Sequence, residues 1–319
     1  MPVSNYPNGF MNGVTIRGVP ILQTHPGQVF FVNNSSVLPE GGVGGNNGNP
    51  GTYLKPLATL DYAVGKCTAS RGDVICLMPG HAETISSATA LALDVAGIAI
   101  VGLGEGSLRA TFTLGTVATT TIAVSAANIS IKNVVFSANF ADIAEVFTPS
   151  AVNFHVEDCA FEAAGANLNF LELADTGTTN NQCDGLSFLR CSWIEADTAT
   201  KSMLAIDADL DQLSVVDCYF NLGVNSSDLP VIAAVATGKD VTNVQIKGNT
   251  CIRLNDANPL LLTADTTTAN TGVVSGNFVR HLDTAAELLV TAGTNFGFFN
   301  NYATAAVDAS GFLLPAADS

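Results

Sequence analysis

Residues 213–220 read LSVVDCYF, and the same eight-residue pattern returns through most of the chain. Mostly apolar residues occupy its first, third and eighth positions, and the later copies carry Cys or Asn at the sixth. The other copies are ISIKNVVF (129–136), FHVEDCAF (154–161), LSFLRCSW (186–193), VQIKGNTC (244–251), GVVSGNFV (272–279) and FGFFNNYA (296–303), with a weaker early copy, IAIVGLGE, at 98–105. Successive copies start 24 to 32 residues apart, so the chain is an array of repeats.

A second apolar stretch precedes most copies, as in TIAVSA from residue 121 and FLELAD from residue 170. Each unit is therefore a strand, a polar turn, a second strand, a bend and a loop. A unit of this length without helical periodicity fits one coil of a parallel β-helix. Leucine-rich repeats need a leucine and asparagine pattern that is missing, and a propeller blade needs about 40 residues. We predict an all-β fold, a parallel β-helix of about nine coils and roughly 40 Å in length.

The sixth position of the repeat predicts two stacked ladders at one bend. It holds Val134, then three cysteines and then three asparagines: Cys159, Cys191, Cys218, Asn249, Asn277 and Asn301. Inward cysteines act as small apolar side chains, and stacked asparagine amides bond one another and the backbone of the bend. Thiols on successive coils would lie about 5 Å apart in a line, which is too spread for tetrahedral zinc.

The chain divides into four expected segments. Residues 1–28 form an irregular N-terminal arm, and residues 29–71 hold a lead-in strand, a Gly-rich loop and a capping helix. The β-helix spans 72–303, and 304–319 is a C-terminal tail or cap carrying Phe312, Leu313 and Leu314. The helix is expected at 56–69, PLATLDYAVGKCTA, with Pro56 at its start and an apolar face that covers the open end of the first coil.

Composition and charge narrow the function. The 319 residues carry a net charge of −16, with 12 basic and 28 acidic side chains, so we expect no nucleic-acid partner and no membrane partner. No stretch is long and apolar enough for a membrane span, and the N-terminus lacks the charged start and apolar stretch of a signal peptide. The seven cysteines contain no CxxC pair, and we expect reduced thiols made in a cytoplasm.

The stretch GDVICLMPGHAETI, residues 72–85, raises the question of a catalytic pair, because His81 and Glu83 stand two residues apart. The order of a Gly-rich loop, a Pro-led helix, Gly-Asp, strand, Pro-Gly and Glu resembles the start of right-handed parallel β-helix proteins of the pectate-lyase-like superfamily. That resemblance implies that Asp73, Pro79, Gly80 and Glu83 serve the turn. We expect Glu83 to accept backbone donors there.

The resemblance extends to a family of bacteriophage-encoded β-helix proteins. It rests on the order of IRGVPILQTHPGQVFFVNNSS, the Gly-rich loop, PLATLDYAVGKCTASRGDVICLMPGHAETI and SAANISIKNVVF, and it covers about residues 14–300. That family is usually associated with structural roles in the virion. The resemblance implies a capsid decoration or cement protein on the virion surface, made in the host cytoplasm and assembled as a homotrimer.

An enzyme of acidic polysaccharides is the competing hypothesis, because the superfamily contains lyases and hydrolases. The motifs resembling those of polygalacturonases, Asn-Thr-Asp, Asp-Asp, Gly-His-Gly and Arg-x-Lys, are absent, and the charge of −16 disfavours a polyanion. Trp193, the only tryptophan, stands at the eighth repeat position, which favours packing. We therefore expect no enzyme and no cofactor. The alternative is a tail-spike or fibre component that binds or cleaves a host glycan.

Two sets of residues are candidate binding sites. Asp207, Asp209 and Asp211 alternate along a strand end and could hold calcium, joined by Glu172 or Asp175, although a solvated turn is the simpler interpretation. We also expect the N-terminal arm to insert between subunits of the major capsid protein or neighbouring protomers, through its apolar residues and one arginine: Phe10, Met11, Ile16, Arg17, Ile21 and Leu22.

Overall fold

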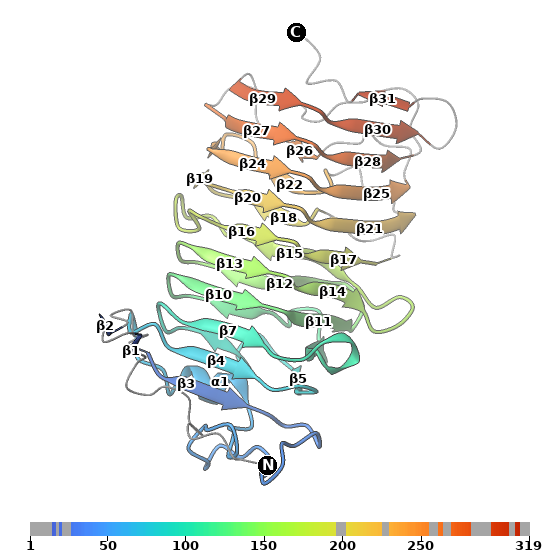
Figure 1. Ribbon diagram of the computed structural model, residues 1–319. Helices are drawn as coiled ribbons and strands as arrows, with labels where there is room; N and C mark the ends of the chain where they lie inside the picture. The colour runs from blue at the N-terminus through green and yellow to red at the C-terminus, as the bar shows by residue number, and fades with distance from the viewer. Residues whose placement is uncertain are drawn as a thin grey trace.

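The computed structural model describes residues 15–16, 19–20, 27–195, 202–224, 230–254, 261–263, 269–281, 295–305 and 310–312. The described chain winds into a solenoid of stacked parallel strands, with the first and last coils at opposite ends (Figure 1). The predicted all-β parallel β-helix is thus confirmed. No helix in the described part is long and apolar enough to cross a bilayer.

Three sheets form the sides of the solenoid. Sheet I contains β3 (Val29–Val32), β4 (Val74–Leu77), β7 (Ala99–Gly102), β10 (Ile129–Lys132), β13 (Phe154–Glu157), β16 (Ser187–Leu189), β20 (Ser214–Val216), β24 (Val244–Lys247), β27 (Thr271–Ser275) and β29 (Asn295–Phe299). Sheet II contains β5 (Ala82–Ile85), β8 (Ala110–Gly115), β11 (Val134–Asn139), β14 (Ala160–Ala163), β17 (Ser192–Ile194), β21 (Tyr219–Val224), β25 (Thr250–Leu254), β28 (Phe278–His281), β30 (Tyr302–Ala305) and β31 (Ser310–Phe312). Sheet III contains β6 (Ala92–Leu93), β9 (Ile122–Val124), β12 (Ile143–Pro149), β15 (Phe170–Asp175), β18 (Leu204–Ile206), β22 (Ala233–Val235) and β26 (Leu262–Thr263).

The number of complete coils is smaller than predicted. Sheets I and II each have ten strands among the described residues, but sheet III has seven, so about seven turns are closed on all three sides. The remaining strands form two short ladders: β1 (Thr15–Ile16) pairs with β2 (Val19–Pro20), and β19 (Leu210–Asp211) pairs with β23 (Val241–Thr242).

Residues in the left-handed backbone region flank the strands of sheet I. The residue at the fifth repeat position has a positive φ in successive coils: Asn133, Asp158, Arg190, Asp217, Gly248, Gly276 and Asn300. The residue just before the first six copies does the same: Gly97, Asn128, Asn153, Gly185, Gln212 and Asn243. Asn, Asp and Gly enter this region at the lowest cost, which explains their recurrence at the bends. These two positions turn the chain sharply onto and off sheet I.

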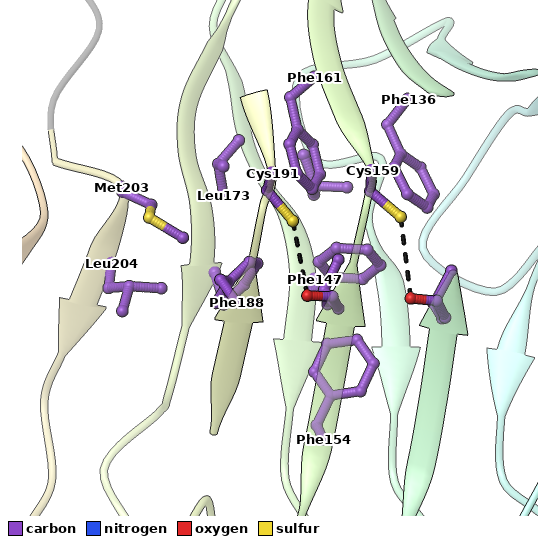
Figure 2. Packing of buried hydrophobic residues seen from close by; sticks show 14 of the residues in the cluster. Phe136, Phe147, Phe154, Cys159, Phe161, Leu173, Phe188, Cys191, Met203 and Leu204 are labelled. Carbon is purple, nitrogen blue, oxygen red and sulfur yellow. Dashed lines mark hydrogen bonds between the residues drawn. The ribbon is translucent and has the colours of Figure 1, made fainter. Parts of the chain in front are cut away.

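The inward positions of the repeat build one continuous core. At the eighth position Phe136 stacks on Phe161 with ring centroids 5.3 Å apart, and Trp193 and Phe220 continue the same register. Figure 2 shows Phe136 and Phe161 beside the Cys159 and Cys191 thiols. Trp193 is fully buried, as its repeat position predicted, and its Nε1 donates to Glu195 Oε2 at 2.7 Å.

Both predicted ladders lie inside the bend between sheets I and II. The Cys159 and Cys191 thiols donate to backbone oxygens of the preceding coil (dashed in Figure 2), over 3.8 Å to Ile131 and 3.5 Å to Val156. The asparagine amides donate to the equivalent oxygens at shorter distance, as Asn249 does to Val215 at 2.9 Å. The ladder prediction is therefore confirmed.

The capping helix is shorter than predicted. α1 spans Leu60–Val64 and not 56–69, and a 3-10 turn at Gly106–Leu108 is the other helical element of the described chain. Pro56 does not start the helix, because the next residue, Leu57, pairs with Val32 as a parallel bridge. Thr59 is the N-cap, and Gly65 ends the helix. The apolar face does cover the first coil, since α1 contacts β3, β4 and β6 and buries Leu60, Ala63 and Val64.

Candidate functional site

Asp73, from the stretch that raised the question of catalysis, is a structural clamp at the start of the solenoid. Its carboxylate is buried and accepts from Arg71 Nε and Nη2 at 2.7 and 2.6 Å, and from the backbone N–H of Gln28 and Thr68 at 2.7 Å each. The hydrogen bonds from Arg71, assisted by those from Thr68 and Gln28, hold the pKa of Asp73 at about 2. The carboxylate thereby joins the lead-in strand, the end of the helix segment and β4.

His81 and Glu83 are also engaged in packing. The N–H of Asn34 donates to His81 Nδ1 at 3.2 Å, so the ring proton lies on Nε2, which faces Glu83 Oε2 at 3.3 Å. That same carboxylate oxygen accepts the N–H of Leu60 at the start of α1 at 3.0 Å, which confirms the expected role of Glu83. The His81 side chain is fully buried. Pro79 and Gly80 form the turn, and Gly80 has φ +76°.

The three alternating aspartates are not gathered around one point. Asp209 Oδ1 accepts the N–H of Asp240, and Asp211 Oδ1 accepts from Thr242 Oγ1 and Asn243 Nδ2 at 2.6 and 2.7 Å. Asp207 lies on an exposed turn. Within the described residues, no group of three or more His, Cys, Asp or Glu side chains is placed to hold a metal ion. The Asp209 and Asp211 oxygens instead tie one coil to the next.

The expected partner-binding residues of the arm have little structural description. Phe10, Met11, Arg17, Ile21 and Leu22 lie outside the described residues. Ile16 belongs to β1, where its backbone pairs with Val19. At the other end, β31 pairs antiparallel with β30, so this part of the tail extends sheet II, while Leu313 and Leu314 lie outside the described residues.

A polar groove of about 540 Å³ crosses the outer face of sheet I, and it was not predicted from the sequence. It is lined by Asn153, His155, Gly185, Ser187, Gln212, Leu213, Ser214, Asn243 and Gln245. His155, Ser187, Ser214 and Gln245 occupy one register position on four adjacent strands. Outward residues carry no apolar period, so only the alignment of the copies at their second position could have revealed this column.

Exposed apolar side chains recur in two parts of the chain. At the N-terminal end they are Val37, Leu38, Val43, Tyr53 and Leu54, all in the segment that precedes α1. On the outer face of sheet II, Tyr219, Phe278 and Tyr302 share one register position on β21, β28 and β30, and exposed Ile194 lies on nearby β17. Contiguous exposed apolar surface marks interaction sites more often than isolated exposed side chains do.

Comparisons with known proteins do not place the chain in a family. No family model matches the chain, and no curated protein matches it. Among solved structures, a rhamnogalacturonan lyase is similar over 90% of both chains, with 13% sequence identity and a TM-score of 0.40. This lyase is a distant neighbour, and a likeness at this level carries no argument about activity.

Proposed function

We propose that this protein is a non-catalytic structural component of a bacteriophage particle, a decoration or cement protein that binds the major capsid protein on the outer shell. The apolar surface at the N-terminal end of the solenoid carries this proposal. It consists of Val37, Leu38, Val43, Tyr53 and Leu54, and each of these side chains is more than two-fifths exposed. Surface of this kind at one end of a rigid rod suits attachment by that end.

The segment that presents this surface is held in one conformation. Val43 N–H donates to the Leu54 oxygen at 3.0 Å, and Asn33 Nδ2 donates to the Val37 oxygen at 3.0 Å. The Tyr53 ring packs edge-on against Phe31 at 5.4 Å. A preorganised surface loses little conformational entropy on binding, which favours tight association. Residues 1–26 lead directly into this end of the solenoid, so the arm and the surface would contact the same partner.

Self-association as a homotrimer is part of the proposal, and the aromatic row on sheet II supports it. The row runs along the solenoid axis and spans four neighbouring strands of sheet II, from β21 to β30. Its aromatic residues are Tyr219, Phe278 and Tyr302. Aromatic residues are enriched at protein interfaces. Protomers that pack side by side with parallel axes would cover this row while their N-terminal ends meet the shell together.

Co-sedimentation with mature capsids that lack tails tests the proposal. The full-length protein is compared with a deletion of residues 1–26, which spares the Gln28 N–H that Asp73 holds. A double variant, Leu38→Asp with Leu54→Asp, tests the surface. Val117→Asp is the control, because Val117 is similarly exposed but lies between β8 and β9 and belongs to neither apolar group. We expect saturable binding at many copies per shell, lost in the deletion and in the double variant and kept in the control.

A second candidate is a tail-spike or fibre component that binds a host glycan, and the polar groove on sheet I favours it. The sedimentation experiment separates the two. Absence of binding to tailless shells, with recovery in tail fractions, would refute the decoration proposal and support the tail component.

A further inference from the structure

The groove on sheet I is a column of hydrogen-bonding side chains with a fixed spacing. Strands β13, β16, β20 and β24 place His155, Ser187, Ser214 and Gln245 side by side at one register position. Neighbouring coils are about 4.8 Å apart, so the column is roughly 15 Å long. Along one edge, Asn153, Gln212 and Asn243 stand on the left-handed turns that precede these strands. These three amide side chains form a second row, parallel to the column of His155, Ser187, Ser214 and Gln245.

Several of these side chains are held in place, and others retain their hydrogen-bonding capacity. Asn153 Nδ2 donates to Asn128 Oδ1, Asn243 Nδ2 donates to Asp211 Oδ1, and Gln245 Oε1 accepts from Lys247. His155, Ser187 and Ser214 make no side-chain hydrogen bond to any described residue. Gly185 leaves room for the Asn153 amide, because a Cβ at residue 185 would lie 2.3 Å from Asn153 Oδ1.

The lining is uncharged, and its polar side chains both donate and accept hydrogen bonds. No Asp, Glu, Lys or Arg lines the groove. Partial burial lowers the pKa of His155, so its imidazole is neutral at physiological pH and offers one donor and one acceptor. Serine hydroxyls and the amides of Asn and Gln likewise donate and accept. A ligand that matches this lining is uncharged and carries many hydroxyl groups.

Other extended ligands fit the groove poorly. A peptide that adds to a sheet needs a free edge, whereas the column lies on strands that are paired on both sides. Nucleic acids and acidic polymers need cations, which the lining lacks, and the chain carries a net charge of −16. We infer that the groove binds a neutral glycan that lies along the solenoid axis across β13, β16, β20 and β24.

Calorimetric titration of the full-length protein tests this inference. The probes are neutral hexasaccharides of glucose and mannose with α and β linkages, and hexagalacturonate is the charged comparison. The variant Ser214→Met fills the groove. Ser192→Met is the matched control, because Ser192 is a partly exposed, outward serine on a strand of sheet II. His155→Ala and Gln245→Ala remove hydrogen bonds without filling the groove.

We expect a neutral hexasaccharide to bind, Ser214→Met and the alanine variants to weaken binding by about tenfold, and Ser192→Met to leave it unchanged. Absence of binding by every neutral probe at millimolar concentration overturns the inference. Preference for hexagalacturonate, or equal losses in Ser214→Met and Ser192→Met, overturns it as well. Capsid sedimentation of Ser214→Met should match wild type, so failure of glycan binding and failure of capsid attachment are distinguishable.

Discussion

The bend between sheets I and II has two halves along the solenoid: a thiol half, where cysteines occupy the sixth repeat position, and an amide half, where asparagines occupy it. The two halves stabilise the same bend through different contacts. In the thiol half, Cys159, Cys191 and Cys218 donate to the preceding coil over 3.5 to 3.8 Å. In the amide half, Asn249, Asn277 and Asn301 donate to the equivalent oxygens at 2.8 to 2.9 Å. Each asparagine also accepts the N–H of the residue at that position in the preceding coil.

The comparison teaches that one bend geometry accepts two chemistries. A thiol is a weak donor and acceptor, so the thiol half depends mainly on burial of small apolar groups. An amide satisfies a backbone N–H and a backbone C=O at once, so the amide half depends on hydrogen bonds that cannot be removed singly without leaving unpaired groups. The two halves should therefore respond very differently to substitution.

The largest effect is expected from Asn277→Leu in the middle of the amide half. Leucine has a similar size but removes the acceptor of the Asn249 N–H and of one of the two Asn249 Nδ2 hydrogens. It also removes the amide that donates to the Ile246 oxygen. Several unpaired buried groups should lower the free energy of unfolding by about 4 kcal/mol. Denaturant unfolding measures this loss. Asn221→Leu, on the outer face of sheet II, is the control and should change stability by less than about 0.5 kcal/mol.

A somewhat smaller effect is expected at the start of the solenoid. There a carboxylate satisfies backbone N–H groups, as the asparagine amides do in the later coils. Asp73→Asn removes a carboxylate that accepts four hydrogen bonds, two of them from Arg71. The loss at neutral pH should be about 3 kcal/mol. Neither ladder changes its charge in acid, so the acid sensitivity of the two regions should differ.

The sign of that sensitivity follows from the lowered pKa of Asp73. Its folded value is about 2, whereas an unperturbed aspartate titrates at about 4. The stabilisation is therefore fully present above about pH 4 and is lost as the pH falls toward 2. The melting temperature should fall less steeply between pH 5 and pH 2 for Asp73→Asn than for the wild type. Parallel curves for the two proteins would contradict this assignment.

A gain of stability is expected where the two halves meet. Cys218→Asn places an amide next to Asn249 in a bend that already accepts one, with the Cys191 N–H and the Phe188 oxygen available as partners. The replaced contacts are long, at 3.4 and 3.6 Å. We expect the free energy of unfolding to rise by up to about 1 kcal/mol. A loss of that size in denaturant unfolding would mean that the thiol half excludes amides for steric reasons.

The same contrast shows what the sequence could reveal. The ladders were predictable because inward positions repeat with the coil, so Cys191 and Asn277 align on sequence alone. The extent of α1 could not be predicted in the same way, because the Leu57–Val32 bridge is a tertiary contact that overrides local helical spacing. The groove was missed because Ser187 and Gln245 are outward residues without an apolar period, and only the alignment of the copies at their second position relates them. The sequence already places His81 and Glu83 close together. Only the structure shows that the backbone N–H groups of Asn34 and Leu60 donate to them.

The smallest effect concerns the rate at which each half opens, and two buried thiols report it. Cys191 lies in the thiol half, whereas Cys251 lies in the coil of Asn249. Interaction with Cys218 and burial raise the pKa of Cys191, and burial raises that of Cys251, so labelling of either thiol requires local opening. Cys251 is nearer the C-terminal end, where opening is ordinarily easier. If the amide bonds hold their half together, maleimide labelling followed by mass spectrometry should find Cys251 modified no faster than Cys191. Faster labelling of Cys251 would show that fraying from the end outweighs the stronger hydrogen bonds of the amide half.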